Sequence, residues 1–245
     1  MTSDWKAVVV PRSRRRSWAI VVVVGACLLA APAIVRAQNS PTEFLPEIDS
    51  YFTLNSQVRL VFQAKDTREG GAPEQAEIGP SIEFYLKPLL RLKKITAFDL
   101  DDVKSRPLVF AVGYRYVASP GKAAINRLEP VVTFHFPVKL QILLSDKNRA
   151  DLDWQNSVFT WRYRNRLTAE RRIAIRSYHP APYVSAEVFY TSQYQKWSTT
   201  ALYAGCLLDV GKHVQFDPYY EHENNTGKTP SQSLNLVGLV LNLHF

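Results

Sequence analysis

The sequence predicts an all-β protein, an antiparallel up-and-down transmembrane β-barrel that follows an N-terminal signal peptide. Three observations lead to this prediction. The chain opens with a basic and then an apolar segment, apolar and polar residues alternate along most of the remainder, and an aromatic residue ends the last alternating segment. Alternation with a period of two is typical of strands whose two faces meet different surroundings.

The first 37 residues have the three parts of a secretory signal. The basic stretch 12–16 precedes the uncharged run 19–31, and Val35 and Ala37 are the small residues expected before a cleavage site. We expect cleavage before Gln38, which leaves residues 38–245 as the barrel domain. Two alternatives stay open: lipidation at Cys27, which ends a lipoprotein-like box, and retention of the apolar run as a membrane anchor.

The formal net charge of the 245-residue chain is +8, a value that on its own suggests a nucleic-acid binder. Residues 1–37 account for five of these charges, so that the predicted mature chain has only +3. The 46% of hydrophobic residues excludes a disordered chain. The two cysteines, Cys27 and Cys206, exclude a disulfide scaffold and a four-cysteine metal site. We expect no nucleic-acid partner, no cofactor and no metal.

Eleven segments after residue 38 have the alternating pattern of strands. In chain order they are 47–54, 57–66, 77–87, 107–118, 126–136, 140–153, 158–171, 181–191, 197–209, 212–222 and 233–245. Their apolar faces carry, for example, Val58, Leu60 and Phe62, then Ile78, Ile82 and Phe84, then Phe110, Val112 and Tyr114, then Leu128, Val132 and Phe134, then Phe159 and Trp161, then Val184, Ala186 and Val188, then Val214 and Phe216, and last Val237 and Leu239. Both termini of such a barrel are expected on the periplasmic side, which requires an even number. We therefore expect about twelve strands, with ten as the alternative, and a hidden strand within 88–105 or 172–180.

Alternation alone does not separate a membrane barrel from a soluble sandwich, in which the apolar face is inside. Two further features favour the barrel. Aromatic residues gather near strand ends, as in interfacial girdles; they are Tyr114, Tyr116, Trp154, Trp161, Tyr190, Tyr194, Tyr219 and Tyr220. Short turns at 54–56, 137–139 and 210–212 alternate with long loops at 67–76, 118–125 and 223–231, although 88–105 breaks this pattern.

The C-terminal residue, Phe245, ends a segment in which Leu239, Leu241 and Leu243 alternate with other residues. Bacterial outer-membrane proteins commonly end in an aromatic residue preceded by such an alternation, which the assembly machinery recognises. We therefore predict location in the bacterial outer membrane, with outer-membrane lipid as surroundings and the barrel-assembly machinery as a partner through Phe245.

A set of motifs in a fixed order resembles a known family. The motifs are Gly79–Pro88, Lys104–Leu108, Gly113–Tyr116, Asn126–Glu129, Asp146–Leu152, Arg162–Leu167, Glu187–Tyr190 and Tyr219–Asn224. Together they are similar to the bacterial outer-membrane family known as domain of unknown function 2490, over about residues 45–245. The resemblance implies an outer-membrane barrel and implies no activity.

The polar face of the strands is rich in charge. We expect the following residues to face the lumen: Arg127, Glu129, Lys147, Arg149, Asp151, Arg162, Arg164, Arg166, Glu187, Asp217 and Glu221. Neighbouring strands lie about 4.8 Å apart, so that such side chains can form ion pairs across strands. The ladder either braces the inside of a structural barrel or forms the charged constriction of a small pore, with a small solute as its partner.

An outer-membrane lipid hydrolase is the alternative from another functional class. It would use His135, His213 or His244 as the base, Ser185 as the nucleophile, and Glu129 or Glu187 as the third group. The sequence contains neither G-x-S-x-G nor H-E-x-x-H, so we expect no catalytic residue. A soluble periplasmic β-sandwich that binds a ligand is the further alternative.

Overall fold

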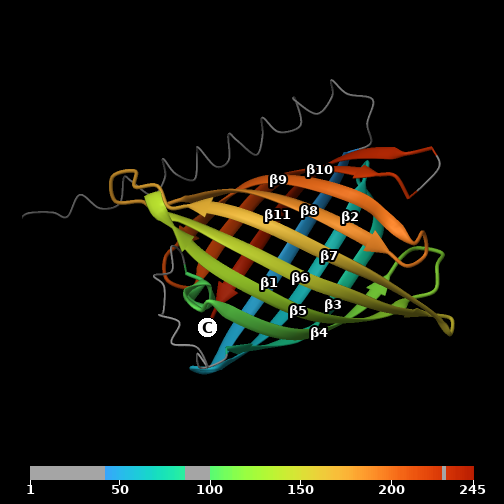
Figure 1. The fold of residues 1–245 in the computed structure, drawn as a ribbon, viewed down its shortest axis with the longest axis horizontal. Helices are drawn as coiled ribbons and strands as arrows, with labels where there is room; N and C mark the ends of the chain where they lie inside the picture. Colours follow the sequence, from blue (N-terminus) through green and yellow to red (C-terminus); the bar gives the residue numbers. More distant parts are fainter. Residues whose placement is uncertain (1–41, 86–99, 228–229) are drawn as a thin grey trace, which may run out of the picture. The chain divides into compact units, whose positions relative to one another are not determined.

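The computed structural model describes residues 42–85, 100–227 and 230–245 of the chain. Eleven strands follow in chain order: β1 (Thr42–Asn55), β2 (Val58–Glu69), β3 (Ala72–Tyr85), β4 (Leu108–Ala118), β5 (Ile125–Val138), β6 (Ile142–Gln155), β7 (Val158–Arg171), β8 (Ala181–Thr191), β9 (Lys196–Val210), β10 (Val214–Asn225) and β11 (Gln232–His244). Two short 3₁₀ helices, η1 (Asp102–Ser105) and η2 (Lys139–Gln141), lie in connections (Figure 1). The predicted signal peptide, its cleavage site and Cys27 lie outside the described residues. In the described ranges, no helix is long and apolar enough to cross a membrane.

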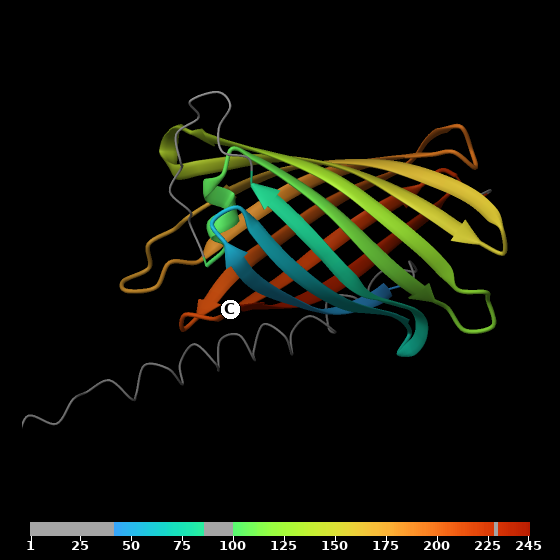
Figure 2. The same ribbon diagram turned by 90° about the horizontal axis from the view of Figure 1, so that it is seen from below.

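The strands form one closed barrel, which confirms the predicted fold class (Figures 1 and 2). Each strand pairs with its neighbours in sequence in antiparallel fashion, and β1 closes the ring by pairing with β11. A closed sheet leaves no unpaired edge. The alternative of a two-layered sandwich is wrong, because a single sheet curves round and meets itself.

The described strands number eleven, so the expectation of twelve or ten is wrong for this part of the chain. With an odd number, the first and last strands run in the same direction, and β1 pairs with β11 in parallel, from Thr42 opposite Asn235 to Tyr51 opposite His244. The start of β1 and the end of β11 therefore lie at opposite ends of the barrel. The even count assumed an antiparallel closure, which the parallel seam makes unnecessary.

The two proposed sites of a hidden strand have other structures where they are described. Residues 102–105 form η1, and within 172–180 only Ile175 and Tyr178 pair, in an isolated bridge. Each of the eleven predicted segments overlaps one observed strand. We name the two ends of the barrel for the connections they carry: end A holds those after β2, β4, β6, β8 and β10, and end B holds those after β1, β3, β5, β7 and β9, together with Phe245.

Connection lengths do not distinguish the two ends in the predicted way. The predicted long loop at 67–76 is a two-residue turn, because β2 and β3 stay paired up to Glu69 and Ala72. Gly70 and Gly71 form that turn with φ of 57° and 89°, a region that favours glycine. Residues 100–107, which precede β4, and the connection 172–180 both lie at end B, where short turns were expected. Pro73 and Glu74 suggested that the loop extends to residue 76, but residues 72–76 belong to β3.

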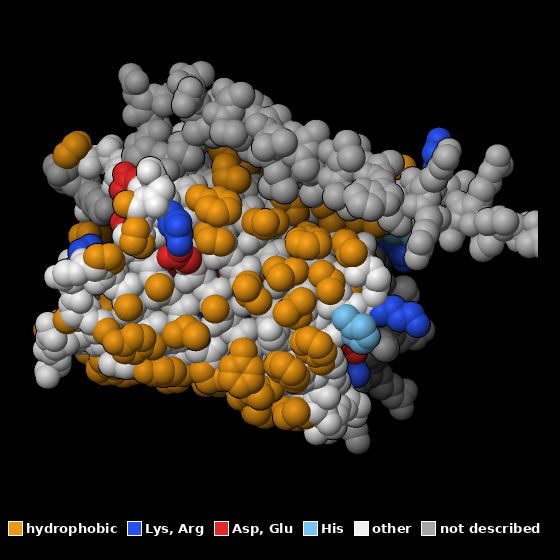
Figure 3. All heavy atoms as spheres, turned by 180° about the vertical axis from the view of Figure 1, so that it is seen from behind, with side chains coloured by type: hydrophobic (Ala, Val, Ile, Leu, Met, Phe, Trp, Pro, Cys, Tyr) orange, Lys and Arg blue, Asp and Glu red, His pale blue; other side chains and the backbone are white. Residues whose placement is uncertain are grey.

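The barrel has a polar inside and an apolar outside. Phe62 and Leu202 keep 47% and 59% of their surface exposed, whereas Arg59 keeps 3% and Asp151 none. Figure 3 shows apolar side chains spread over the outer wall of the strands on that face of the molecule. Water-soluble proteins bury their apolar residues and rarely bury charges. This chain reverses that arrangement over most of the barrel wall, although a small cluster of apolar side chains, Tyr85, Val103 and Val109, is buried near end B.

Aromatic side chains are distributed unevenly along the outer wall. Near end A, the exposed aromatic residues include Trp and Tyr, namely Tyr114, Tyr116, Trp154, Trp161 and Trp197. Near end B they are Phe, namely Phe52, Phe84, Phe134, Phe136 and Phe245. Tyr219, which we expected in a girdle, lines the lumen instead.

Candidate functional site

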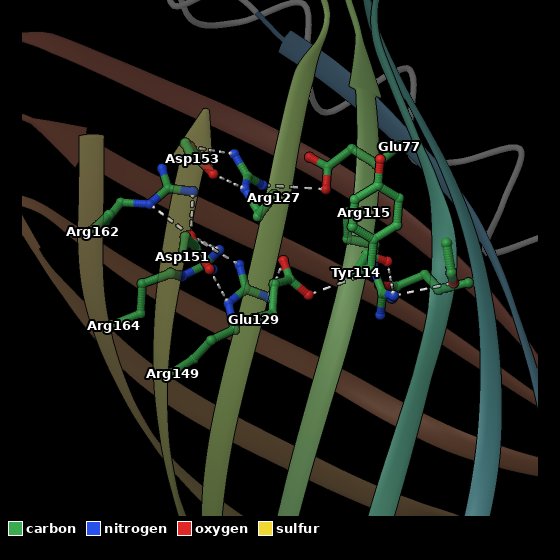
Figure 4. Close-up of polar contacts among 12 residues, drawn as sticks. Glu77, Tyr114, Arg115, Arg127, Glu129, Arg149, Asp151, Asp153, Arg162 and Arg164 are labelled. Atoms are coloured by element: carbon green, nitrogen blue, oxygen red, sulfur yellow. Dashed lines mark hydrogen bonds and ion pairs between the residues drawn. The ribbon is translucent and has the colours of Figure 1, made fainter. Parts of the chain in front are cut away.

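The lumen of the barrel holds an ion-pair ladder on β5 to β8 (Figure 4). Charged residues face one another because the strand register aligns them: Asp151 lies opposite Arg162, and Arg166 lies opposite Glu187. Alternation places every second residue of each strand inside, so a run such as Arg162, Arg164 and Arg166 shares one face. The ladder therefore follows from the alternation of side chains within each strand and from the pairing register between neighbouring strands.

Asp151 is the centre of the ladder. Its carboxylate is fully buried and lies 2.7 Å from Arg149 Nε, 2.6 Å from Arg162 Nη2 and 3.9 Å from Arg164 Nη1. Figure 4 shows these guanidinium groups converging on it from β6 and β7. A buried carboxylate is tolerated only when cations and hydrogen bonds replace its water. Asp151 thus fixes three arginine side chains.

Glu187 is the second centre. Its carboxylate receives Arg164 Nε at 2.7 Å, Arg166 Nη2 at 2.6 Å and the Tyr203 hydroxyl at 2.8 Å. Arg164 also lies over the ring of Phe189 at 4.3 Å, and Arg166 lies over Tyr203 at 4.1 Å. Stacking on an aromatic ring and pairing with a carboxylate together suit the planar guanidinium. The two arginines are held against the wall of the barrel.

The ladder continues on β5. Arg127 donates two hydrogen bonds to Asp153, at 2.7 and 3.1 Å, and lies 3.4 Å from Glu77 of β3. Glu129 lies between Arg115 and Arg149, at 3.5 and 3.8 Å. This part of the wall therefore also consists of paired charges.

The opposite wall, formed by β1 and β10, carries carboxylates alone. We call this set the acidic wall: Glu43, Glu47, Asp49, Asp217, Glu221 and Glu223. In the described part of the chain, none of the six forms an ion pair within 4 Å. Two of them accept hydrogen bonds from neutral groups: the Tyr51 hydroxyl donates to Asp49 at 3.2 Å, and the Tyr183 hydroxyl donates to Asp217 at 3.0 Å. Lys65 of β2 lies opposite Glu47 in the strand register. In a ring of eleven strands, β1 lies five positions from both β6 and β7. The β1 part of the acidic wall thus faces the ladder, whereas β10 lies two positions from β8.

Two cavities lie between these walls. The larger has a volume of about 500 Å³ and reaches from end A to the middle of the barrel, where Lys147 and Gln63 line it. The smaller, of about 140 Å³, continues towards end B and shares Gln63, Lys147 and Arg149 with the larger one. The larger cavity therefore opens towards end A, and Lys147 lines the region where the two cavities adjoin.

Two glycines keep the larger cavity open. Tyr183 lies over Gly205 and Tyr219 over Gly238, so closely that a Cβ at these glycines would stand 2.6 and 2.1 Å from the rings. Any side chain at Gly238 would push Tyr219 away from the wall and into the lumen. The rings instead lie along the wall, and both line the cavity.

The segment around η1 crosses the mouth of the barrel at end B. Asp101 accepts from Arg59 of β2 at 2.6 Å, and Lys104 donates to Glu170 of β7 at 2.8 Å. Val103 is buried with Tyr85 and Val109. Because β2 and β7 stand on opposite sides of the ring, these two contacts span the mouth. Burial raises the pKa of Asp101, but Arg59 and Lys104 outweigh burial and hold the pKa at about 2.

The structure places all the charged residues predicted for the lumen on the inner wall. Nine of them line the larger cavity, namely Arg127, Lys147, Arg149, Arg162, Arg164, Arg166, Glu187, Asp217 and Glu221. Glu129 lines the smaller cavity, and Asp151 lies buried among three arginines. The sequence-based set lacked most of the acidic wall. Glu43 precedes the predicted start of the first strand, although the alternation of Glu43, Leu45 and Glu47 with the apolar residues Phe44, Pro46 and Ile48 carried a signal.

The residues of the hydrolase alternative do not come together. His135 Nδ1 lies 2.8 Å from Ser145 Oγ, whereas Ser185 hydrogen-bonds to Thr168 at 2.8 Å. Glu187, a proposed third group, is held by the ladder. His213 and His244 lie at end B, where His213 Nδ1 contacts the His244 carbonyl oxygen at 2.7 Å. Among the described residues, no group of histidine, cysteine or acidic side chains could hold a metal ion.

The C-terminal residues point outward. Leu239, Leu241 and Leu243 face away from the lumen, and Phe245 is 61% exposed and stacks on Phe52 at a ring distance of 5.2 Å. The Phe245 amide donates to the Tyr51 carbonyl at 2.8 Å, which extends the parallel seam to the last residue.

The family suggested by the ordered motifs is confirmed by comparison with family models. The model described as "Protein of unknown function (DUF2490)" matches residues 50–234, which span β2 to β10 and parts of β1 and β11. A search of curated proteins finds no match to the chain. The chain belongs to the DUF2490 family, whose members have no assigned function.

Proposed function

We propose that this protein is an outer-membrane β-barrel that works as a narrow pore for small solutes. The single observation that carries the proposal is the reversed polarity of the wall. Exposed residues such as Phe62, Ile78 and Leu202 would cost about 25 cal/mol for each Å² of apolar surface left in water. In a bilayer the same surface is covered by lipid, and the closed sheet leaves no backbone group unpaired there.

Strand lengths and aromatic residues support the membrane assignment. The strands have 11 to 15 residues, and a tilted membrane-spanning strand needs about 9 to 11. The Trp and Tyr side chains near end A suit the headgroup level of a bilayer, where amphipathic rings gather. An outward-facing, exposed Phe245 remains available to the barrel-assembly machinery, and the N-terminal segment has the pattern of an export signal.

The lumen supports the pore. Its larger cavity is hydrophilic and continues into the smaller one past Lys147, while η1 narrows the mouth at end B. A barrel of this size is largely filled by side chains, so the pore passes small solutes only. We expect conductance well below that of barrels of 16 or more strands.

Two measurements test this proposal. Protein without residues 1–37 should refold and stay monodisperse only with detergent; a monodisperse protein in plain buffer would contradict the membrane assignment. In planar bilayers the refolded protein should give small channel events, and Lys104→Met, which removes one link across the mouth, should make them more frequent. Silent bilayers for the wild type, for Lys104→Met and for Arg164→Ala alike would rule out the pore.

A lipid hydrolase stays as the second candidate because of the His135–Ser145 contact. Both side chains lie on the lumen side of the wall, away from the surface where lipid acyl chains would lie. Turnover of phospholipid or lipopolysaccharide acyl chains, lost in both His135→Ala and Ser145→Ala, would establish this function in place of the pore.

A further inference from the structure

We propose that the lumen binds a small zwitterionic solute, of the size of an amino acid or a dipeptide, between the acidic wall and the ladder. The inference rests on the proposed pore and adds the class of solute that it takes. The site is centred where the two cavities meet, between Lys147 of β6 and Asp49 of β1. The cation of the solute would face the acidic wall, and its carboxylate would face Lys147 and the arginines beside it.

Lys147 supplies the available positive charge. Unlike the arginines around it, Lys147 forms no ion pair within 4 Å in the described ranges, and its side chain is exposed to the lumen. It lines both cavities. Arg162 and Arg166 lie in the same wall and keep about a third of their side-chain surface open, at 31% and 34%. A ligand carboxylate at Lys147 would thus meet two further guanidinium groups.

Asp49 supplies the available negative charge. Its Oδ2 accepts from the Tyr51 hydroxyl, but its Oδ1 is buried without a hydrogen-bond partner. A buried acceptor with no partner is costly, and a ligand ammonium group that donates to it removes that cost. Glu47, next on the same face, accepts from the Gln63 amide and lies opposite Lys65 of β2 in the strand register, and it forms no ion pair within 4 Å among the described residues. Within that part of the chain no donor reaches Asp49 Oδ1, and the ammonium group of the solute would supply one.

The separation of charge selects among ligands. A simple anion near Lys147 would be repelled by the carboxylates opposite, and a simple cation near Asp49 would be repelled by the arginines. An uncharged solute would displace water from both walls without replacing its hydrogen bonds. A solute with both charges satisfies both walls at once. Asp49 lines the smaller cavity and Lys147 lines both, so the solute would lie across the two cavities, the larger of which, at about 500 Å³, is within the size range of small-molecule sites.

The test measures binding to the full chain, purified in detergent, by isothermal titration calorimetry. The probes are alanyl-alanine, its capped and uncharged analogue N-acetylalaninamide, acetate and ethylammonium. We expect alanyl-alanine to bind at least about tenfold more tightly than each of the other three, since each loses one or both charged contacts. Equal binding of the charged and capped compounds, or preferred binding of acetate or ethylammonium, would overturn the proposal. This comparison on the wild type needs no variant.

Variants then locate the site. Lys147→Gln and Asp49→Asn keep side-chain size and should each weaken alanyl-alanine binding about tenfold. Lys122→Gln, in the β4–β5 loop outside both cavities, is the matched control and should have no effect. Unchanged binding in both lumen variants would overturn the assignment. The outcomes distinguish this inference from the proposed pore. If alanyl-alanine binds but the bilayers show no conductance, only the pore is contradicted. If the bilayers conduct but alanyl-alanine is not preferred, only this inference is contradicted.

Discussion

The two halves of the lumen hold their charges in different ways. On β5 to β8, carboxylates and guanidinium groups saturate one another, with Asp151 and Glu187 each shared among arginines. On β1 and β10, none of the six carboxylates forms an ion pair within 4 Å among the described residues, and the groups that donate to Asp49 and Asp217 include neutral tyrosine hydroxyls. The first half has the character of a brace, because each charge fixes its neighbours. The second half has the character of a binding surface, because its charges remain available.

Removing one carboxylate from each half should give the largest difference in stability between the two halves of the lumen. Asp151→Ala leaves three buried guanidinium groups without their shared partner, which should lower the free energy of unfolding by about 3–5 kcal/mol. The control, Glu223→Gln on the acidic wall, removes a charge that forms no ion pair within 4 Å among the described residues and should change stability by less than about 0.5 kcal/mol. Urea unfolding in detergent, followed by tryptophan fluorescence, measures both. Equal losses in the two variants would contradict the division of the lumen.

As the pH falls, the segment around η1 at the mouth of end B should lose its ion-pair contact before the ladder loses any of its own. The folded pKa of Asp101 is about 2, below the unfolded value of about 3.9. The contact with Arg59 is therefore fully present above about pH 4 and is lost as the pH falls towards 2, a contribution of about 2 kcal/mol. Unfolding measured from pH 6 to 2 should show this loss in the wild type and not in Asp101→Asn. An identical acid dependence in both proteins would exclude this role for Asp101.

Filling the space under a lumen tyrosine should affect ligand access more than stability. Gly238→Val forces Tyr219 off the wall, with an overpacking cost of about 1–2 kcal/mol and a smaller cavity on the acidic side. The double variant Gly238→Val, Tyr219→Ala should recover the alanyl-alanine binding that the single variant loses. Calorimetry on the three proteins measures this, and unimpaired binding in the single variant would show that Tyr219 does not border the path.

The feature that the sequence predicted best was the alternation of inward-facing and outward-facing side chains along each strand. Because side chains alternate, the inner positions of Arg162, Arg164 and Glu187 follow from the sequence alone, and so do their apolar neighbours outside. The parallel closure could not be predicted in this way, since the pairing of β1 with β11 joins the two ends of the sheet and leaves no local pattern. The acidic wall depends on that closure, because the pairing of β1 with β11 leaves only β11 between β1 and β10.

The assignment of a long loop at 67–76 was wrong for a different reason. Residues 72–76 include Pro73 and the charged Glu74, which suggested a loop, yet backbone pairing with β2 carries them into β3. The contacts of Gly205 with Tyr183 and of Gly238 with Tyr219 depend on register between neighbouring strands, which one sequence does not encode locally. The link from Lys104 to Glu170 is a contact across the barrel and likewise has no sequence signature.

Lipid should cover the apolar outer face of the barrel, and water should fill its charged interior. Two neighbouring residues of β2 distinguish these two environments. Phe62 points outward and Gln63 points into the lumen. In a Cys206→Ala background without residues 1–37, single cysteines at these positions would carry a spin label in reconstituted vesicles. We predict that oxygen, which concentrates in lipid, relaxes the label at position 62 more strongly, and that a water-soluble nickel chelate relaxes the label at position 63 more strongly. Equal access of the nickel chelate to both labels would contradict the account.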